Sequence, residues 1–181
     1  MRRRSARAAW LLGLAGLAAL GPGGAAAADT LLDSLEQRMA HDRADAVNAY
    51  LVAHWSATMT PLNQKTAACE LHAVSLSVRL ARSTQARAVH AHDEALRAAA
   101  GGCAGFVLAM ATPAEVPRFC GSVSSWGAAQ TARELRRRIA AIDGDELLRA
   151  SRRGQTCRAA YVYELENTRV VVRRVSSSRA K

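Results

Sequence analysis

Apolar residues recur at every third or fourth position along most of the chain, and stretches in which apolar and polar residues alternate are almost absent. The first pattern is typical of a helix with one buried face, whereas alternation would indicate a strand. Apolar stripes of this kind lie within residues 31–39, 47–54, 69–81, 132–142 and 157–172. The sequence therefore predicts an all-α fold, a compact helical bundle of about five to seven helices.

One helix is predicted at the centre of this bundle. Residues 61–82 carry two neighbouring apolar stripes, one of which begins at Leu71. A helix with so wide an apolar face belongs in the middle of a bundle. A second helix is predicted over 84–100, and Gly101 and Gly102 are expected to end it.

The N-terminal residues have the three parts of a secretory signal peptide. Four arginines within residues 1–7 precede an apolar run over 8–20, and small residues follow as far as Ala28. An uncleaved membrane anchor is the alternative, but the run is short for a membrane crossing and Gly-Pro-Gly-Gly follows it. We therefore expect a signal peptide over 1–28, cleavage before Asp29, and a protein that is periplasmic or secreted.

The mature chain has the length of one domain. We predict a helical domain over 29–175, followed by a disordered basic tail over 176–181. The three valines at 170–172 would also suit a strand. A lone strand would have no pairing partner, so the prediction for this stretch is a helix.

Four cysteines lie in the mature chain, namely Cys69, Cys103, Cys120 and Cys157. An even number in an exported protein indicates two disulfides, and four cysteines allow three pairings. A zinc site built on Cys69 and His72 is the alternative. It is disfavoured because no second pair of closely spaced ligands accompanies these two.

Helix geometry favours one of the three pairings. If the helices over 61–82 and 84–100 fold back at Ser83, Cys69 lies fourteen residues before the turn and Cys103 twenty after it. The difference of six residues corresponds to about 9 Å along a helix, which Gly101 and Gly102 could absorb by turning the chain back. The prediction is therefore Cys69 with Cys103, which leaves Cys120 to pair with Cys157.

Positive charge is concentrated in the last third of the chain. Residues 29–132 contain eight Lys or Arg against nine Asp or Glu, whereas residues 133–181 contain thirteen against six. This imbalance predicts a basic face for anionic lipid headgroups, envelope polysaccharide or an acidic protein, although a merely solvated face would show the same composition. Nucleic acid is not expected as a partner outside the cytoplasm. The candidate binding arginines are Arg136, Arg137, Arg138, Arg152 and Arg153.

Aromatic residues add candidates for a protein interface, because Tyr, Trp and Arg often anchor such interfaces. Tyr161 falls on the last apolar stripe and is predicted to be core, whereas Tyr163 falls off it. Trp126 and Trp55 are further candidates, with simple burial as the alternative for each tryptophan.

The stretch AVHAHDEALR at 88–97 raises the question of a metal site. On a helix His90 and His92 differ by about 200° in direction, so they cannot share one ion. His90 and Glu94 could coordinate together, but no motif supplies further ligands. The two acids of the stretch precede Arg97 at helical spacing, so we predict a charge-paired surface.

No catalytic signature is found elsewhere in the sequence. The chain lacks GxSxG, a phosphate-binding loop, a dinucleotide fingerprint and CxxCH. Glu164 and Glu166 lie two positions apart, so on a helix they diverge and do not form a glycosidase pair. We predict a non-enzymatic protein without cofactor or metal ion.

One combination of motifs resembles a known family. A first cysteine in a helix, CAGFV at 103–107, FC at 119–120, a helix near GAAQTARELRRRI at 127–139 and a final Cys157 are similar to the small periplasmic immunity proteins that neutralise type VI secretion amidase effectors. The resemblance implies a compact, disulfide-braced helical protein with a protein partner in the envelope. Two functions stay open: an immunity or inhibitor protein, and an envelope adaptor or stress protein that binds anionic surfaces through its basic C-terminal third.

Overall fold

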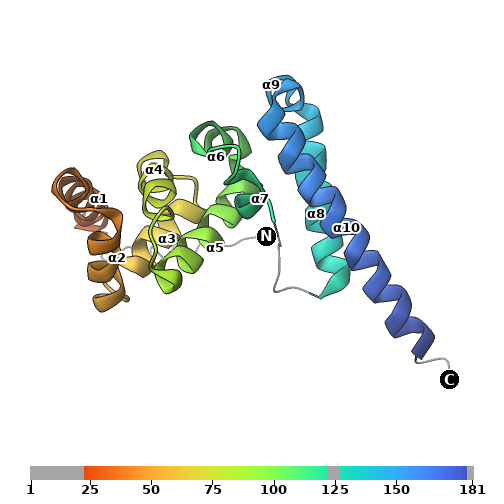
Figure 1. The fold of residues 1–181 in the computed structure, drawn as a ribbon, viewed down its shortest axis with the longest axis horizontal. Coiled ribbons are helices and arrows are strands. Elements are labelled where there is room, and N and C mark those ends of the chain that lie inside the picture. Colours follow the sequence, from red (N-terminus) through yellow and green to blue (C-terminus); the bar gives the residue numbers. More distant parts are fainter. Residues whose placement is uncertain (1–22, 122–126, 179–181) are drawn as a thin grey trace, which may run out of the picture.

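The chain is all-helical wherever the structure describes it (Figure 1). The computed structural model describes the backbone of residues 23–121 and 127–178, and the side chains within 30–121 and 127–168. Within these ranges there are ten helices and no strand: α1 (Gly23–His41), α2 (Ala44–Ala53), α3 (Met59–Ala67), α4 (Leu71–Leu80), α5 (Ala86–Gly102), α6 (Ala104–Met110), α7 (Val116–Phe119), α8 (Ala128–Gly144), α9 (Glu146–Ala150) and α10 (Arg152–Ser178). The predicted fold class is confirmed, and the predicted number of five to seven helices is wrong.

The helix predicted over 61–82 is broken at Cys69, which accounts for part of the difference. Cys69 has φ 64° and is the one non-glycine residue in the described chain with a left-handed backbone. The Glu70 N–H donates to the Lys65 carbonyl at 3.0 Å, and this bond across a left-handed residue is the usual way in which a helix ends. Leu71 becomes the first residue of α4 and is exposed rather than buried, whereas Val74 and Val78 of the same stripe are buried as predicted.

The prediction that the next helix ends at Gly101 and Gly102 is confirmed, although both glycines are themselves helical. Helix α5 ends at Gly102, and Cys103 is the single residue between it and α6. Neither glycine has a positive φ. An ordinary helical conformation is therefore open to both, and tertiary contacts override their low helix propensity.

Both predicted disulfides are present. Cys69 and Cys103 are joined with their Cα atoms 6.1 Å apart, and Cys120 and Cys157 with theirs 5.2 Å apart. Since Cys69 lies in the break between α3 and α4, it reaches the end of α5 without the turn that the two glycines were expected to make. The bridges indicate an oxidising, exported compartment.

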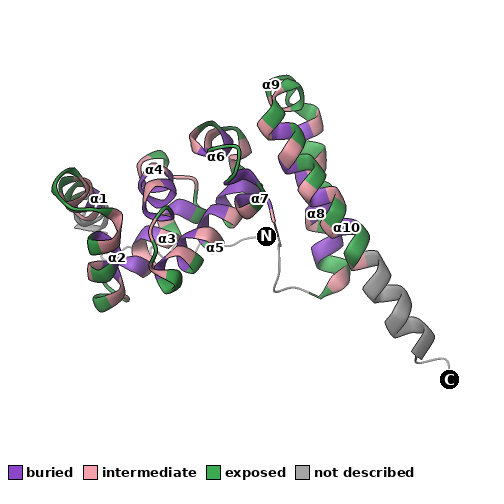
Figure 2. Ribbon diagram, viewed as in Figure 1, coloured by how far each residue is buried: buried purple, intermediate pink, exposed green. Residues whose placement is uncertain are grey.

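The core consists of two apolar clusters, visible as the purple inner faces in Figure 2. The first packs α1 to α5 and has buried apolar side chains from each, including Leu32, Leu51, Leu62, Leu76 and Ala88. The second joins α4 and α5 to the helices after them and includes Val78, Leu96, Phe119, Leu135, Cys157 and Tyr161. Because α4 and α5 contribute to both clusters, they lie at the centre of the molecule. A central position was predicted for the helix over 61–82, which includes α4.

Helices α8, α9 and α10 form the C-terminal arm, in which α8 and α10 lie side by side (Figure 1). Side-chain bonds join Arg138 to Tyr161 and Asp143 to Arg158, so the two helices are antiparallel. Helix α10 includes residues 170–172, which confirms helix over strand there, and it reaches Ser178. The first three residues of the predicted tail are therefore helical, and 179–181 lie outside the described residues.

The proposed signal peptide lies largely outside the described part of the chain. Its residues 1–22 are not described, and α1 begins at Gly23 within the predicted signal segment. In the described ranges no helix is both long enough and apolar enough to span a membrane.

Candidate functional site

The outer face of α10 carries the most exposed aromatic residue of the described chain. Cys157, Tyr161 and Leu165 turn inward at helical spacing and are buried in the core. Tyr163, two positions from Tyr161 and therefore on nearly the opposite side, is 68% exposed. The prediction that Tyr161 is core and Tyr163 is a surface residue is confirmed.

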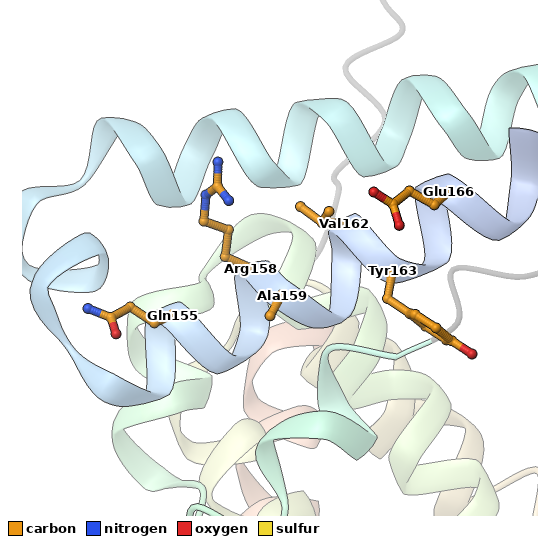
Figure 3. A pocket seen from close by; sticks show the side chains of 6 residues that line it. All are labelled: Gln155, Arg158, Ala159, Val162, Tyr163 and Glu166. Carbon is orange, nitrogen blue, oxygen red and sulfur yellow. The ribbon is translucent and has the colours of Figure 1, made fainter.

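A shallow depression of about 480 Å³ surrounds Tyr163 (Figure 3). We call it the α10 groove; its lining residues are Gln155, Arg158, Ala159, Val162, Tyr163 and Glu166. All of them come from one helix at spacings of three and four, which places them on one face. In Figure 3 Arg158 points toward α8, whereas Tyr163 projects away from it.

Arg158 connects the groove to α8. Its guanidinium donates two hydrogen bonds to the Asp143 carboxylate, at 2.6 and 3.1 Å. The pKa of Asp143 is lowered, mainly by these hydrogen bonds from Arg158. The two side chains are 45% and 41% exposed, so solvent screens the pair and it adds little to stability.

Helix α10 is held firmly behind this face. The Cys120–Cys157 bridge ties it to α7, and both sulfur-bearing residues are fully buried. Arg153 donates to the carbonyls of Leu108 and Ala109, which fixes the first turn of α10 against α6. The groove is therefore displayed on a rigid support.

A second depression lies between α6 and α9. It measures about 370 Å³, and its lining is mainly apolar, with Leu108, Leu147 and Leu148 among its side chains. Leu147 is 83% exposed. The Asp145 side chain caps α9 by accepting from the Leu148 N–H at 3.0 Å, which holds Leu147 outward in this short helix.

The candidate arginines differ in exposure and bonding, and Arg138 lies in the core rather than on a surface. Arg138 is 5% exposed and bonds to Glu134 and the Arg97 carbonyl. Arg137 bonds to Glu134 and the Gly101 carbonyl, and Arg153 caps α6 as described. Arg136 and Arg152 are exposed and make no side-chain bond within the described chain.

Glu134 balances much of the arginine charge on α8. Its carboxylate accepts from Arg137 and Arg138, at 2.6 and 2.8 Å. Hydrogen bonds from Arg137 first, and from Arg138, lower the pKa of Glu134 to about 2. Burial raises the pKa of the neighbouring Tyr161 phenol.

Of the two tryptophan candidates, one lies within the described residues and is not part of the groove. Trp126 lies outside the described residues. Trp55 is half-buried, and the guanidinium of Arg87 lies 4.5 Å from its ring centroid. Trp55 is thus not an open anchor like Tyr163.

Only part of the stretch at 88–97 lies at the surface, which corrects the prediction of a charge-paired surface there. His90 is exposed and lies 3.5 Å from Glu94, but His92 is completely buried. Asp93 pairs with Arg118 at 2.7 Å rather than with Arg97. Helical spacing correctly separated the two histidines but did not reveal which of them faces the core.

Sequence reasoning identified Tyr163 and missed the rest of the α10 groove. Ala159, Val162 and Glu166 lack a motif, and their common signal is their spacing from Tyr163 along one helical face. Comparison of the chain with protein-family models, curated proteins and solved structures found no match. Among the described residues no three of His, Cys, Asp and Glu lie close enough together to hold a metal ion.

Proposed function

We propose that this chain is an exported binding protein of the periplasm or the cell exterior, which holds a protein partner of the envelope through the α10 groove. The immunity or inhibitor class fits this description, and so does the resemblance in the cysteine and CAGFV motifs. The observation that carries the proposal is the exposed Tyr163 on a helix anchored by a buried disulfide.

Three features of the groove favour a protein partner. A tyrosine gives a large contact area with few rotatable bonds and a hydroxyl for hydrogen bonding, which is why it is enriched at interface centres. Ala159 and Val162 supply small apolar contacts beside it, and Arg158 and Glu166 place charges of opposite sign at the edge. The disulfide and the Arg153 bonds organise the face before binding, which reduces the ordering cost.

The alternative, an adaptor for anionic envelope surfaces, has less support. Such binding needs several free cations on one face. In the described chain Arg137, Arg138, Arg153 and Arg158 are already bonded to carboxylates or carbonyls. Arg136 and Arg152 remain available, one on α8 and the other at the start of α10.

Affinity capture from a periplasmic extract tests the proposal. We expect a stoichiometric complex that survives about 0.5 M salt, because exposed charge pairs are screened at that ionic strength whereas apolar contacts are not. Tyr163→Ala should reduce recovery about tenfold or more, as expected for an interface anchor. Leu71→Ala, which removes an exposed side chain of similar character from α4, is the matched control and should leave recovery unchanged.

Binding that disappears between low and moderate salt, and that Arg136→Ala weakens more than Tyr163→Ala, would instead support the adaptor function.

A further inference from the structure

The two disulfides differ sharply in their access to solvent. Cys120 and Cys157 are both 0% exposed and belong to the core. Cys69 and Cys103 are only partly buried and pack at the edge of that core. The bridges span 34 and 37 residues, so loop-closure entropy hardly distinguishes them. Access is therefore the main difference between them.

Gly102 leaves one side of the outer bridge uncovered. This glycine is exposed at the end of α5, and a Cβ atom placed on it would lie 3.2 Å from the Cys69 sulfur. No side chain of residue 102 therefore stands over that sulfur. Thiol–disulfide exchange requires a thiolate to reach a sulfur atom directly, so this opening bears on reactivity.

The backbone at Cys69 adds a second reason for exchange at this bridge. A left-handed conformation is unfavourable for a residue with a side chain, and φ at Cys69 is 64°. The disulfide helps to hold Cys69 in that conformation at the break between α3 and α4. Opening the bridge frees the residue from this constraint.

We propose that the Cys69–Cys103 disulfide is a site of thiol–disulfide exchange, with a dithiol oxidoreductase as the reacting partner, and that the Cys120–Cys157 disulfide is not. A thiolate of the dithiol attacks one sulfur of the Cys69–Cys103 bond and forms a mixed disulfide. The bond between the two cysteines breaks, and the released sulfur takes up a proton. The second thiol of the partner then loses its proton and attacks the mixed disulfide. Both cysteines end as thiols, and the two electrons come from the partner, which ends as a disulfide.

Opening the Cys69–Cys103 bridge affects the end of α5, which supports the C-terminal arm. Arg137 and Arg138 on α8 donate to the carbonyls of Gly101 and Arg97, at 2.9 and 2.7 Å. Both carbonyls belong to the end of α5 that the bridge fastens to Cys69. Exchange at Cys69–Cys103 thus loosens the same helix end on which α8 rests, while the buried bridge keeps α10 attached to α7.

The test measures the initial rates at which the two bridges of the native, full-length mature chain are reduced. The protein is treated with dithiothreitol, or with catalytic thioredoxin and dithiothreitol, quenched with iodoacetamide and mapped by peptide mass. We expect Cys69 and Cys103 to be alkylated about tenfold faster or more than Cys120 and Cys157, and thioredoxin to accelerate the first pair alone. Equal rates, or faster reaction of the buried pair, would overturn the proposal.

A glycine variant separates access from general stability. Gly102→Val should slow reduction of the outer bridge several-fold, because its side chain covers the Cys69 sulfur. Gly144→Ala is the control, since a Cβ atom there meets nothing within 4 Å, and it should react like the unsubstituted protein. If Gly102→Val does not fold, as judged by circular dichroism, Gly102→Ala provides the same comparison. An unchanged rate in a folded Gly102 variant would refute the shielding argument.

Discussion

Arg138 illustrates how one residue of a basic run can become part of the core. It directly follows two exposed arginines in the sequence, Arg136 and Arg137, yet its guanidinium is buried against Tyr161, with its centre 5.6 Å from the ring centroid. Gly101 makes room for it, because a Cβ atom there would lie 2.6 Å from the Arg138 Nη2. A glycine on α5 and an arginine on α8 thus depend on each other.

We predict that Arg138→Ala lowers the free energy of unfolding by about 3 kcal/mol, since it removes one partner of a buried charge pair and leaves the Arg97 carbonyl without its donor. Urea denaturation under non-reducing conditions measures the change. Arg136→Ala removes the same side chain two positions away, where it is exposed, and should change stability by less than about 0.5 kcal/mol. Similar losses in the two variants would show that Arg138 has no special structural role.

His92 is a second polar residue in the core, and its burial changes its acid–base behaviour. Its Nε2 lies 2.9 Å from the Asn48 Oδ1, and the Asn48 Nδ2 donates to the Leu80 carbonyl at 2.9 Å. Because the Asn48 oxygen can only accept, Nε2 carries the proton. Within the described chain the buried Nδ1 has no hydrogen-bond partner, and burial lowers the pKa of His92 to about 4.

This pKa predicts acid sensitivity. The folded state keeps His92 neutral, whereas the unfolded chain binds a proton below its ordinary pKa of 6.5. The free energy of unfolding should therefore fall as pH is lowered from 6.5 to 4, by about 3 kcal/mol over the window. Glu115 and Glu134, whose pKa values are lowered to about 2, lose their contribution mainly below pH 4.5.

Denaturation curves between pH 7 and 5 provide the measurement. His92→Gln should flatten the dependence in this window, whereas His90→Gln, at an exposed site, should leave it as in the unsubstituted protein. A His92→Gln curve parallel to that of the parent would count against the buried-histidine explanation.

At the scale of helices, apolar periodicity was sufficient to predict a helix and its buried face where a single apolar face packs against the core. The stripe at 132–142 became the inner side of α8, and Cys157, Tyr161 and Leu165 became that of α10. Periodicity could not locate the break at Cys69, because a left-handed cysteine has no local signal and depends on a partner thirty-four residues away. The end of α5, by contrast, lies at Gly102, where the two glycines predicted it.

The α10 groove shows that sequence periodicity also predicts only part of a functional site. Tyr163 could be assigned to the surface because it falls off its stripe by two positions. The full set of hydrogen-bond partners of the arginines could not be predicted, since it depends on which carboxylates and helix ends the fold brings near each guanidinium. Arg153 donates to carbonyls at the end of α6, and Arg138 donates to the Arg97 carbonyl of α5. Both partners are more than forty residues away in the sequence, so local spacing does not reveal them.

At the scale of the whole molecule, the packing of α1 bears on the predicted signal-peptide cleavage site. The helix begins at Gly23, and its described side chains, which start at Thr30, contribute Leu31, Leu32 and Leu35 to the first core cluster. Glu36 on the same helix accepts from Arg79 on α4 at 2.6 Å. These described contacts, which attach α1 to the molecule, are all made by residues of the predicted mature chain.

We therefore predict that removal of residues 1–28 leaves the fold intact and that the exported protein begins at Asp29. Intact-mass analysis of exported material should give the mass of residues 29–181 less four hydrogens, one pair for each disulfide. Far-ultraviolet circular dichroism of this form should show mainly helix, because its core retains both apolar clusters.

A shorter form beginning at Gln37 tests the role of α1. It lacks Leu32, Leu35 and Glu36 and should lose several kcal/mol of stability, since burying each leucine contributes about 2 kcal/mol. An exported mass that retains the first 28 residues would refute the cleavage site, and equal stability of the two truncated forms would refute the role given to α1.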